Sequence, residues 1–307
     1  MGYWLSGLLR RLARVPPPWL LAFGRWLAIP LAALARGRRR IVEANLALCL
    51  PELSPAERSQ LATRNLRSTA LSLFENLLAW HAPRLRDRHG RPLLRLEGEP
   101  LLHQALQAGH GAILLAPHFT MLELIPRAFT DPDLVSKLPD WQAVQVARQQ
   151  KNQALQALID SGRRRWGPTV DKKDARGMLR TLRAGHVLFY APDQNFSQST
   201  VFAPFFGVPA ATTTATSRLA RATGSPVLPC LVRRDGPGWL VQVLPPLSDF
   251  PGEDEIENAA RINALIENAV REAPEQYLWA HRRFRSRPEG QAPLYDDAVL
   301  KPKHRQR

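Results

Sequence analysis

Short apolar runs alternate along the middle of the chain with longer segments of helical periodicity. Each run is bounded by glycine, proline or polar residues, which is typical of buried strands. The predicted strands cover residues 111–116, 142–147, 186–191, 226–232 and 239–244. The predicted helices lie near residues 119–129, 150–165, 173–184, 212–223 and 255–272. This alternation predicts an α/β sheet that helices cover on both faces.

Two more helices and a short strand are predicted ahead of this region. One helix begins after Ser54, because a proline follows this capping residue and Glu57 is placed to close a capping box. It runs to about Ala82. A short strand is predicted at residues 93–96 and a helix at residues 100–108. Stretches rich in proline and glycine predict ordered loops at residues 204–209, 235–238 and 245–252.

The N-terminal region has the pattern of a membrane-associating segment. Residues 3–14 place leucines on one helical face and arginines near the other, as in a basic helix at a bilayer surface. Residues 19–35 are apolar except for Arg25, but they are shorter than the ~20 residues of a comfortable span. Four arginines between positions 36 and 40 follow, as a cytoplasmic flank would. A buried packing helix is the alternative for this region.

These patterns divide the chain into three parts. We expect N-terminal membrane-associating helices over residues 1–40, which lie on the bilayer or span it once. The main domain is expected over residues 41–295, and a basic tail over residues 296–307.

Composition adds a strong positive charge to this picture. The 307 residues include 42 Lys and Arg against 27 Asp and Glu, which gives a net charge of +15. Nucleic acid, an anionic lipid surface, phosphorylated substrates and acidic proteins all fit such a charge. The two cysteines, Cys49 and Cys230, lie far apart and form no CxxC motif, so a disulfide framework or a cysteine metal site is not expected.

One histidine and one acid form the first candidate catalytic pair. His118 follows the predicted strand 111–116, and Glu123 lies five positions later. On a regular helix these two side chains would point about 140° apart. They can meet only if His118 lies on the turn before the helix, which Pro117 favours because proline disfavours helical torsions in the residue before it.

Other polar residues follow the remaining strands or lie near the end of the chain. Asp193 follows the strand 186–191, and Arg148 follows the strand 142–147. Arg282 and Arg283 belong to a cationic cluster near the C-terminus. Ligands of open α/β sheets bind at the carboxyl ends of strands, so these residues are expected to converge near His118. Taken singly, each arginine fits a solvated surface equally well, and Asp193 fits a turn.

A set of motifs in a fixed order carries a family resemblance. The motifs are Pro117-His118-Phe119 with Glu123, Tyr190-Ala191-Pro192-Asp193, residues 202–207, Thr212-Thr213-Thr214, residues 273–277 and His281-Arg282-Arg283-Phe284. From about Arg40 to Tyr295, the chain resembles the late acyltransferases of bacterial lipid A biosynthesis, the lauroyl/myristoyl type within the glycerolipid acyltransferase superfamily. The superfamily usually has aspartate where this chain has Glu123, which adds one methylene of reach. The implied fold is α/β, with a mixed central sheet covered by helices.

The resemblance implies an O-acyltransferase that moves a fatty acyl chain from acyl carrier protein to a hydroxyl of a Kdo-bearing lipid A precursor. The expected location is the cytoplasmic face of the inner membrane. His118 would remove the proton of the acceptor hydroxyl, and Glu123 would fix the imidazole ring. Arg148 is assigned to the developing oxyanion or a substrate phosphate, and Asp193 to orienting Arg148 or the acceptor. No metal or cofactor follows from the sequence.

The positive charge then fits three anionic partners: the acidic carrier protein, the phosphorylated glycolipid acceptor and the membrane. The candidate contacts are Arg163, Arg164, Arg165, Lys172, Lys173, Arg282 and Arg283. The alternatives are an acyltransferase of another glycolipid or phospholipid, such as a mannosylated phosphoinositide, and a non-catalytic lipid-binding protein. A membrane-tethered nucleic-acid-binding protein is disfavoured, because the sequence has no helix-turn-helix or zinc motif. The acyl chain length, the acceptor hydroxyl and the oligomeric state stay open at this point.

Overall fold

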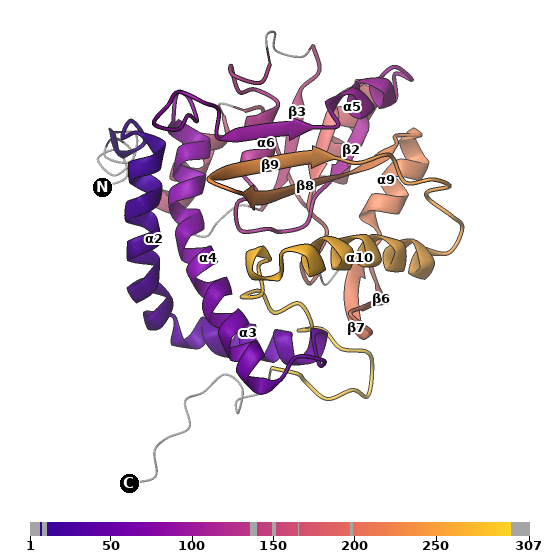
Figure 1. The fold of residues 1–307 in the computed structure, drawn as a ribbon. Helices are drawn as coiled ribbons and strands as arrows, with labels where there is room; N and C mark the ends of the chain where they lie inside the picture. The colour runs from indigo at the N-terminus through magenta and orange to yellow at the C-terminus, as the bar shows by residue number, and fades with distance from the viewer. Residues whose placement is uncertain are drawn as a thin grey trace.

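The computed structural model describes residues 7, 11–135, 140–148, 152–164, 166–196 and 199–295. In this part of the chain a seven-stranded sheet has the order β1-β9-β8-β2-β5-β3-β4 (Figure 1). The strands are β1 (Leu94–Glu97), β2 (Ala112–Leu115), β3 (Ala143–Ala147), β4 (Thr169–Asp171), β5 (Val187–Tyr190), β8 (Val227–Asp235) and β9 (Gly238–Val243). The β8–β9 pair is antiparallel, and the other pairs of this described sheet are parallel. The expected mixed α/β sheet is confirmed.

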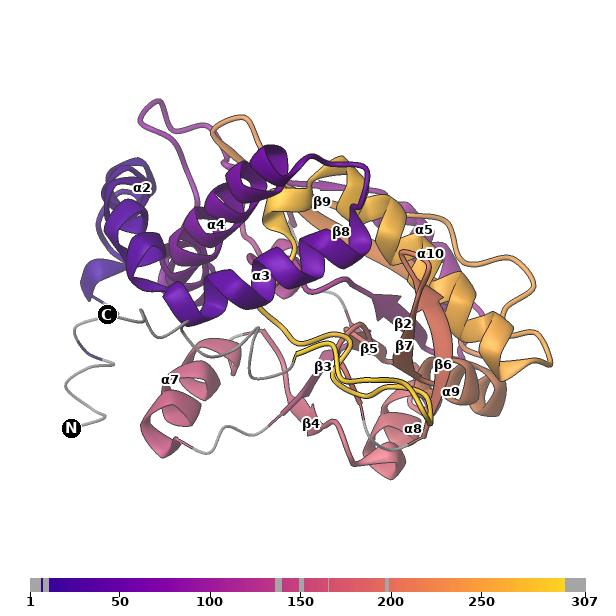
Figure 2. The same cartoon turned by 90° about the horizontal axis from the view of Figure 1, so that it is seen from below.

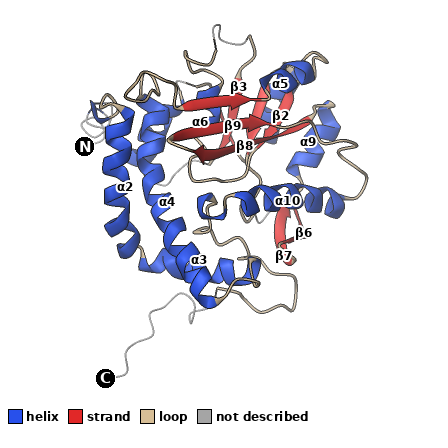
Figure 3. Ribbon diagram, in the orientation of Figure 1, coloured by secondary structure: helices blue, strands red, loops and turns tan. Residues whose placement is uncertain are grey.

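Helices surround this sheet, as the colouring by secondary structure shows (Figure 3). They are α2 (Pro17–Leu34), α3 (Arg36–Cys49), α4 (Pro55–His81), α5 (Glu99–Leu106), α6 (Leu124–Ala128), α7 (Gln153–Arg163), α8 (Ala175–Arg183), α9 (Ala215–Thr223) and α10 (Glu255–Glu272). A 3₁₀ turn, η1, covers Pro274–Gln276. Figure 2 shows α3, α4 and α10 in the upper part of the view, beside β8 and β9, and α7 and α8 in the lower part, beside β3 and β4.

The start of α4 confirms the predicted capping box. The Ser54 hydroxyl accepts from the Glu57 backbone N–H, and the Glu57 carboxylate accepts from the Ser54 N–H at 2.7 Å. Two of the four unpaired N–H groups of the helix end are satisfied in this way. The helix ends at His81, one residue from the predicted end.

A β-hairpin replaces the loop that was predicted at residues 204–209. Strands β6 (Thr200–Phe205) and β7 (Val208–Thr213) pair antiparallel, with Pro204 opposite Pro209. Neither proline has an N–H, so this position must be a non-hydrogen-bonded pair, where a ladder loses nothing. The Pro204 carbonyl accepts instead from Asn263 Nδ2 of α10 at 2.8 Å. The helix predicted from residue 212 therefore begins only at Ala215.

The helix predicted over residues 119–129 is also shorter than expected. Residues 119–123 form an irregular turn, because Phe119 makes a β-bridge with Tyr277 and the Thr120 N–H donates to the Gln276 carbonyl at 2.8 Å. Bonds to a distant segment thus replace the local helical bonds. The short strand β4 was not predicted, and it adds to the edge of the sheet beside β3.

Helix α2 lies alongside α4, and the contact is close (Figure 1). A Cβ on Gly24 would come within 2.8 Å of Phe74 Cδ2, so glycine permits this approach. The other face of α2 exposes large apolar side chains: Trp19, Phe23, Trp26, Ile29 and Leu34. Of the helices in the described residues, α2 is the one long and apolar enough to cross a membrane by length and composition.

The boundary predicted near the N-terminus lies within a helix of the structure. The division at residue 40 falls inside α3, which continues to Cys49 and packs on α4. Most of the predicted amphipathic helix at residues 3–14, and the whole predicted tail at residues 296–307, lie outside the described residues.

Strands β2 and β5 are fully buried, and they position the candidate site. They run parallel in the register Ala112–Val187 to Leu115–Tyr190, and the Ala116 N–H donates to the Tyr190 carbonyl at 2.9 Å. Their carboxyl ends therefore lie side by side.

Candidate active site

His118 and Asp193 lie where these two adjacent strands end. The His118 backbone N–H donates to Asp193 Oδ2 at 2.8 Å, and the ring Nδ1 bonds to Asp193 Oδ1. The aspartate side chain is 1% exposed, whereas that of the histidine is 23% exposed. One carboxylate thus holds both the backbone and the ring of His118, while part of the ring stays accessible.

The charges of this pair favour a histidine that can act as a base. Burial would raise the pKa of Asp193, but the His118 ring, its N–H and Arg283 together hold that pKa below its usual value. Because an ionised carboxylate only accepts, Nδ1 of His118 carries a proton. In the neutral ring Nε2 then has the free lone pair, which is the arrangement a general base needs.

The segment after η1, residues 277–283, closes the site on a third side. The Leu278 N–H donates to the His118 carbonyl at 3.0 Å, and the Asn195 N–H donates to His281 Nε2 at 2.9 Å. Burial, followed by the charge of His118, lowers the pKa of His281 to about 4. The cavity that His118, Asp193 and His281 line measures about 10 Å³, close to the smallest volume that admits a water.

Two asparagines that the sequence analysis did not identify hold this segment in place. Asn45 Nδ2 of α3 donates to the carbonyls of Trp279 and His281 at 2.6 and 2.8 Å. Asn65 Nδ2 of α4 donates to the Glu275 and Tyr277 carbonyls at 3.0 and 2.6 Å. Asparagine inside an amphipathic helix is a weak signal for such a role, because a buried amide must find partners beyond its own helix.

Glu123 differs from the expectation, because its side-chain bonds do not go to the histidine. Its carboxylate accepts from Trp80 Nε1 at 2.8 Å and from Arg163 Nη2 at 2.5 Å. Burial would lower the pKa of Arg163, but the Glu123 carboxylate raises it above the usual value. Glu123 therefore ties α4 to α7 beside the site, and the ring of His118 is held by Asp193 instead.

Arg148 lies farther along the same sheet edge. It follows β3, which is separated from β2 by β5, and its exposed side chain lines a cavity of about 350 Å³ together with Arg163 and Arg164. Burial and the charge of Arg148 lower the pKa of the neighbouring Lys172. The expectation that Asp193 orients Arg148 is not met, since the side-chain bonds of Asp193 go to His118. Arg165 lies outside the described residues.

The two C-terminal arginines of the prediction have different environments. Arg282 is exposed. Arg283 is 3% exposed and donates to the Ala211 carbonyl at 2.6 Å and to Thr212 Oγ1 at 2.8 Å. Burial lowers the pKa of Arg283. It fastens the segment after η1 to β7 and adds positive charge near Asp193, so direct contact with a large substrate does not fit its position.

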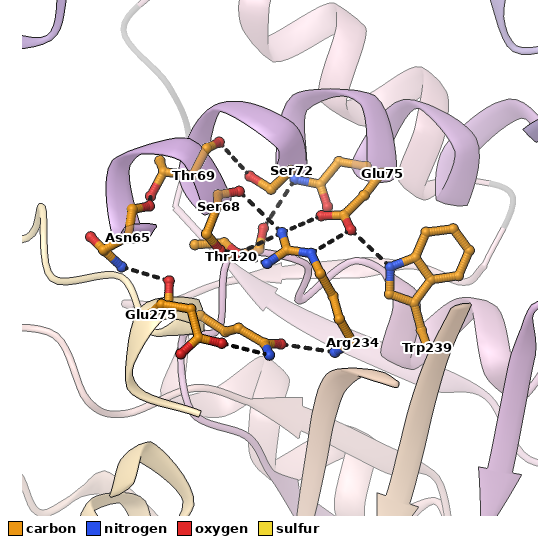
Figure 4. A network of polar contacts seen from close by, with 11 residues as sticks. Asn65, Ser68, Thr69, Ser72, Glu75, Thr120, Arg234, Trp239 and Glu275 are labelled. Atoms are coloured by element: carbon orange, nitrogen blue, oxygen red, sulfur yellow. Dashed lines mark hydrogen bonds and ion pairs between the residues drawn. The ribbon is translucent and has the colours of Figure 1, made fainter. Parts of the chain in front are cut away.

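A buried polar network supports the turn that follows His118 (Figure 4). Arg234 of β8 donates from Nε and Nη2 to the Glu75 carboxylate at 2.7 and 2.6 Å, and from Nη1 to Ser68 Oγ at 2.6 Å. Trp239 Nε1 also donates to Glu75, at 2.9 Å. Thr120 joins the network through Ser68 at 3.3 Å. Helix α4 is thereby linked to the sheet directly beneath the histidine turn.

The remaining reactive groups offer no second centre in the described part of the chain. No group of three His, Cys, Asp or Glu residues there is arranged to hold a metal ion. Burial raises the pKa of the Cys49 and Cys230 thiols, which suits packing rather than nucleophilic attack.

Comparison with known proteins places this geometry in context. Residues 1–286 match the family model described as bacterial lipid A biosynthesis acyltransferase. The chain is 35% identical over 297 residues to the lipid A biosynthesis lauroyltransferase of Escherichia coli (strain K12), covering 94% of each chain. It is 32% identical over 304 residues to the lipid A biosynthesis palmitoleoyltransferase of the same strain, covering 95% of each. A crystal structure of the 1-acyl-sn-glycerophosphate acyltransferase PlsC from Thermotoga maritima, covering 81% of this chain and 97% of its own, gives a TM-score of 0.37 at 14% identity. That likeness is too slight to carry an argument.

Proposed function

The chain belongs to the family of bacterial lipid A biosynthesis acyltransferases, and on that premise we propose that it transfers a fatty acyl chain from acyl carrier protein to a hydroxyl of a Kdo-bearing lipid A precursor. The single observation that supports the catalytic part is the partly exposed His118 ring bonded to the buried Asp193 carboxylate.

The proposed reaction needs one base and no covalent enzyme intermediate. His118 Nε2 takes the proton of the acceptor hydroxyl as its oxygen attacks the thioester carbonyl carbon. The tetrahedral intermediate collapses, the carbon–sulfur bond breaks, and the imidazolium returns its proton to the departing thiolate. The products are an ester and the free thiol of the carrier. Asp193 stabilises the imidazolium and keeps the ring in the reactive orientation.

The surrounding charges fit the anionic groups of both substrates. We assign Arg148 and Arg164, which line the cavity beyond β5, to a substrate phosphate or to the acidic carrier protein. Exposed Arg282 serves the same partners. Glu123 acts as a positioning residue through Arg163 and Trp80, since its carboxylate is bonded to both.

Membrane attachment through α2 completes the proposal. The exposed apolar face of α2 is followed directly by the arginines of α3, a combination that suits anionic lipid. We propose that this region holds the enzyme at the cytoplasmic face of the inner membrane.

The test is an acyl-transfer assay with the full-length chain in detergent. Acyl carrier protein loaded with laurate, myristate or palmitoleate is offered with the Kdo-bearing precursor, and the lipid product is identified by mass spectrometry. Activity is expected with at least one donor, and His118→Ala should lower the turnover by ~10²–10⁴-fold. The control is His103→Ala, which changes an exposed histidine on α5. Full activity of His118→Ala would refute the base assignment.

The same assay tests the two substrates. Acyl coenzyme A replaces the carrier in one arm, and precursor without Kdo, or lysophosphatidic acid, replaces the acceptor in the others. The proposal expects the carrier and the Kdo-bearing lipid to give the highest kcat/KM. A clear preference for the glycerophosphate acceptor would contradict it.

A further inference from the structure

An apolar groove lies between α2, α4 and the segment after η1. Its volume is about 440 Å³, within the ~300–1,000 Å³ of typical ligand sites. Helix α4 contributes Leu66, Thr69, Ala70 and Leu73, which follow helical spacing and form one stripe. The groove is therefore a continuous, largely aliphatic surface rather than a gap between unrelated side chains.

One end of this groove meets the candidate active site. Leu278 and His281 line both the groove and the small cavity that contains His118 and Asp193. The Leu278 N–H donates to the His118 carbonyl, so a residue that lines the groove is bonded directly to the histidine turn. A long apolar group lying in the groove would bring its polar end toward the catalytic ring.

The other side of the groove joins the exposed apolar surface of α2. Leu73, which lines the groove, is 62% exposed, and the ring of the neighbouring Phe74 lies 5.9 Å from that of Phe23 on α2. Trp26 and Leu34 on α2 are 67% and 78% exposed. An apolar path thus leads from the surface proposed to contact the bilayer into the groove.

We infer that this groove takes one alkyl chain of the membrane-embedded acceptor lipid and guides the lipid's hydroxyl to His118. The inference rests on the proposed function. The acceptor resides in the bilayer that α2 faces, so its chain can enter without crossing water. The exposed Arg38 lies at the groove and donates to the Ala280 carbonyl at 3.3 Å, which places a cation where an anionic lipid headgroup would lie.

The acyl chain of the donor fits this groove less well. The donor arrives on a soluble acidic protein, and the basic cavity of Arg148 and Arg164 lies at the end of β3. None of the described residues that line this cavity also lines the groove. The two substrates would then approach His118 along separate surfaces.

The first test needs no catalysis. The full-length chain is incubated with phosphatidylethanolamine and phosphatidylglycerol vesicles that contain a phospholipid with a diazirine in one acyl chain. After irradiation, labelled peptides are mapped by mass spectrometry. Labels are expected on residues 66–73 and 278–281 as well as on the outer face of α2. Labels confined to α2 would overturn the inference.

Variants that fill the groove or place a charge in its lining make the labelling test specific. Thr69→Phe should remove the labels at residues 66–73 and 278–281 while labelling of α2 persists. Leu73→Asp, at an exposed position, should do the same if the first variant is unstable. The matched control is Gln60→Phe, which adds the same side chain at an exposed position of α4 outside the groove. Unchanged groove labelling in both Thr69→Phe and Leu73→Asp would overturn the inference.

Kinetic measurements distinguish the acceptor's alkyl chain from the donor's acyl chain as the occupant of the groove. Thr69→Phe should raise the KM for the lipid acceptor by about tenfold or more, because an apolar chain loses its buried contacts, with the donor KM little changed. If the variant instead shifts the preference among donor chain lengths, the groove holds the donor chain and the inference is wrong. Absence of transfer by the wild-type chain would refute the proposed function, while the labelling result would still decide the groove.

Discussion

At the scale of single residues, the proposed role of His118 as a base depends on which carboxylate holds its ring. Asp193 accepts bonds from both the backbone and Nδ1 of His118, so the imidazole has one orientation and one tautomer. The low pKa of Asp193 follows from these bonds and keeps the carboxylate ionised. The proposed catalytic unit is thus a pair whose members lie at the ends of neighbouring strands.

Replacing Asp193 by asparagine tests this pairing. The amide can donate to Nδ1 and so favour the tautomer with its proton on Nε2, which cannot accept the hydroxyl proton. We expect Asp193→Asn to lower kcat by at least ~10²-fold in the transfer assay. Circular dichroism verifies the fold of the variant. A kcat within about threefold of the wild type would remove Asp193 from the mechanism.

His281 gives a prediction about stability and pH. Its pKa is about 4 in the folded protein and near the usual 6.5 when unfolded, so the unfolded chain binds more protons between these values. The free energy of unfolding should therefore fall as the pH drops through this window, by on the order of 3 kcal/mol in total. Urea midpoints measured at about pH 7 and about pH 4.5 test this.

The comparison for this prediction is His281→Gln, whose amide oxygen can still accept from the Asn195 N–H. This variant should lose less stability on acidification than the wild type. His103→Gln, at the exposed α5 position, should behave as the wild type does. Equal pH dependence in His281→Gln and the wild type would show that His281 does not carry the effect.

The sequence analysis paired His118 with Glu123, whereas the structure bonds its ring to Asp193. The spacing from His118 to Glu123 suggested a pair, yet the turn at residues 119–123 directs Glu123 to Trp80 and Arg163. Asp193 was placed at the same sheet edge because it follows a buried strand. Which of two nearby acids reaches the ring depends on the order and register of β2 and β5, and a single sequence does not encode these locally.

At the scale of elements, α4 links the segment after η1 to strand β8. Through Asn65 it holds the segment after η1, and through Glu75 it holds the β8 residue Arg234 beneath the histidine turn. The length of α4 and its capping box were predictable from the sequence because both depend on local contacts. The bonds of Asn65 and Glu75 were not, because their partners are 159 to 212 positions away.

The Glu75–Arg234 pair should show strong coupling in a double-mutant cycle. Arg234→Met leaves the Glu75 carboxylate, 2% exposed, with the Trp239 N–H as its remaining neutral donor, and should cost about 3–5 kcal/mol of unfolding free energy. Adding Glu75→Gln removes the buried charge and keeps an acceptor for Trp239, so the double variant should regain part of that loss. Urea unfolding measures each state.

The matched control is the pair of Arg91 and Asp87, whose arginine side chain is 73% exposed, so that Arg91→Met should change stability little. A double variant at the buried pair that is as unstable as the sum of its single changes would contradict the coupling.

The β6–β7 hairpin shows where local sequence signals mislead. Pro204, Gly207 and Pro209 are residues that usually mark loops, and the sequence analysis placed a loop there. The two prolines face each other at a position that needs no N–H, and α10 supplies the partner for one carbonyl. The hairpin is therefore compatible with its prolines only because of its pairing register and its packing on α10.

At the scale of the whole molecule, positive charge and exposed apolar surface are distributed differently. The net charge of +15 includes the arginines after α2 and the cavity beyond β5, whereas the largest exposed apolar side chains gather on α2 and at Leu73 of α4. Composition predicted a strongly basic protein, and the apolar pattern of the N-terminal region predicted membrane association. It did not predict how α2 packs on α4, and that packing decides which face of α2 stays exposed.

Removing the aromatic side chains from the exposed face of α2 tests the membrane assignment. Trp19 and Trp26 are 72% and 67% exposed, so Trp19→Ser with Trp26→Ser should leave the fold intact. Burying each such side chain in lipid is worth roughly 1.5–3 kcal/mol, so binding to phosphatidylglycerol-containing vesicles should weaken by ~10²-fold or more in a co-sedimentation assay. Ile256→Ser, which removes an exposed apolar side chain from α10, should bind as the wild type does. High salt should weaken the binding further, because the arginines after α2 contribute through charge. Undiminished binding of the double variant would place the attachment elsewhere in the chain, and the apolar path from bilayer to groove would lose its entrance.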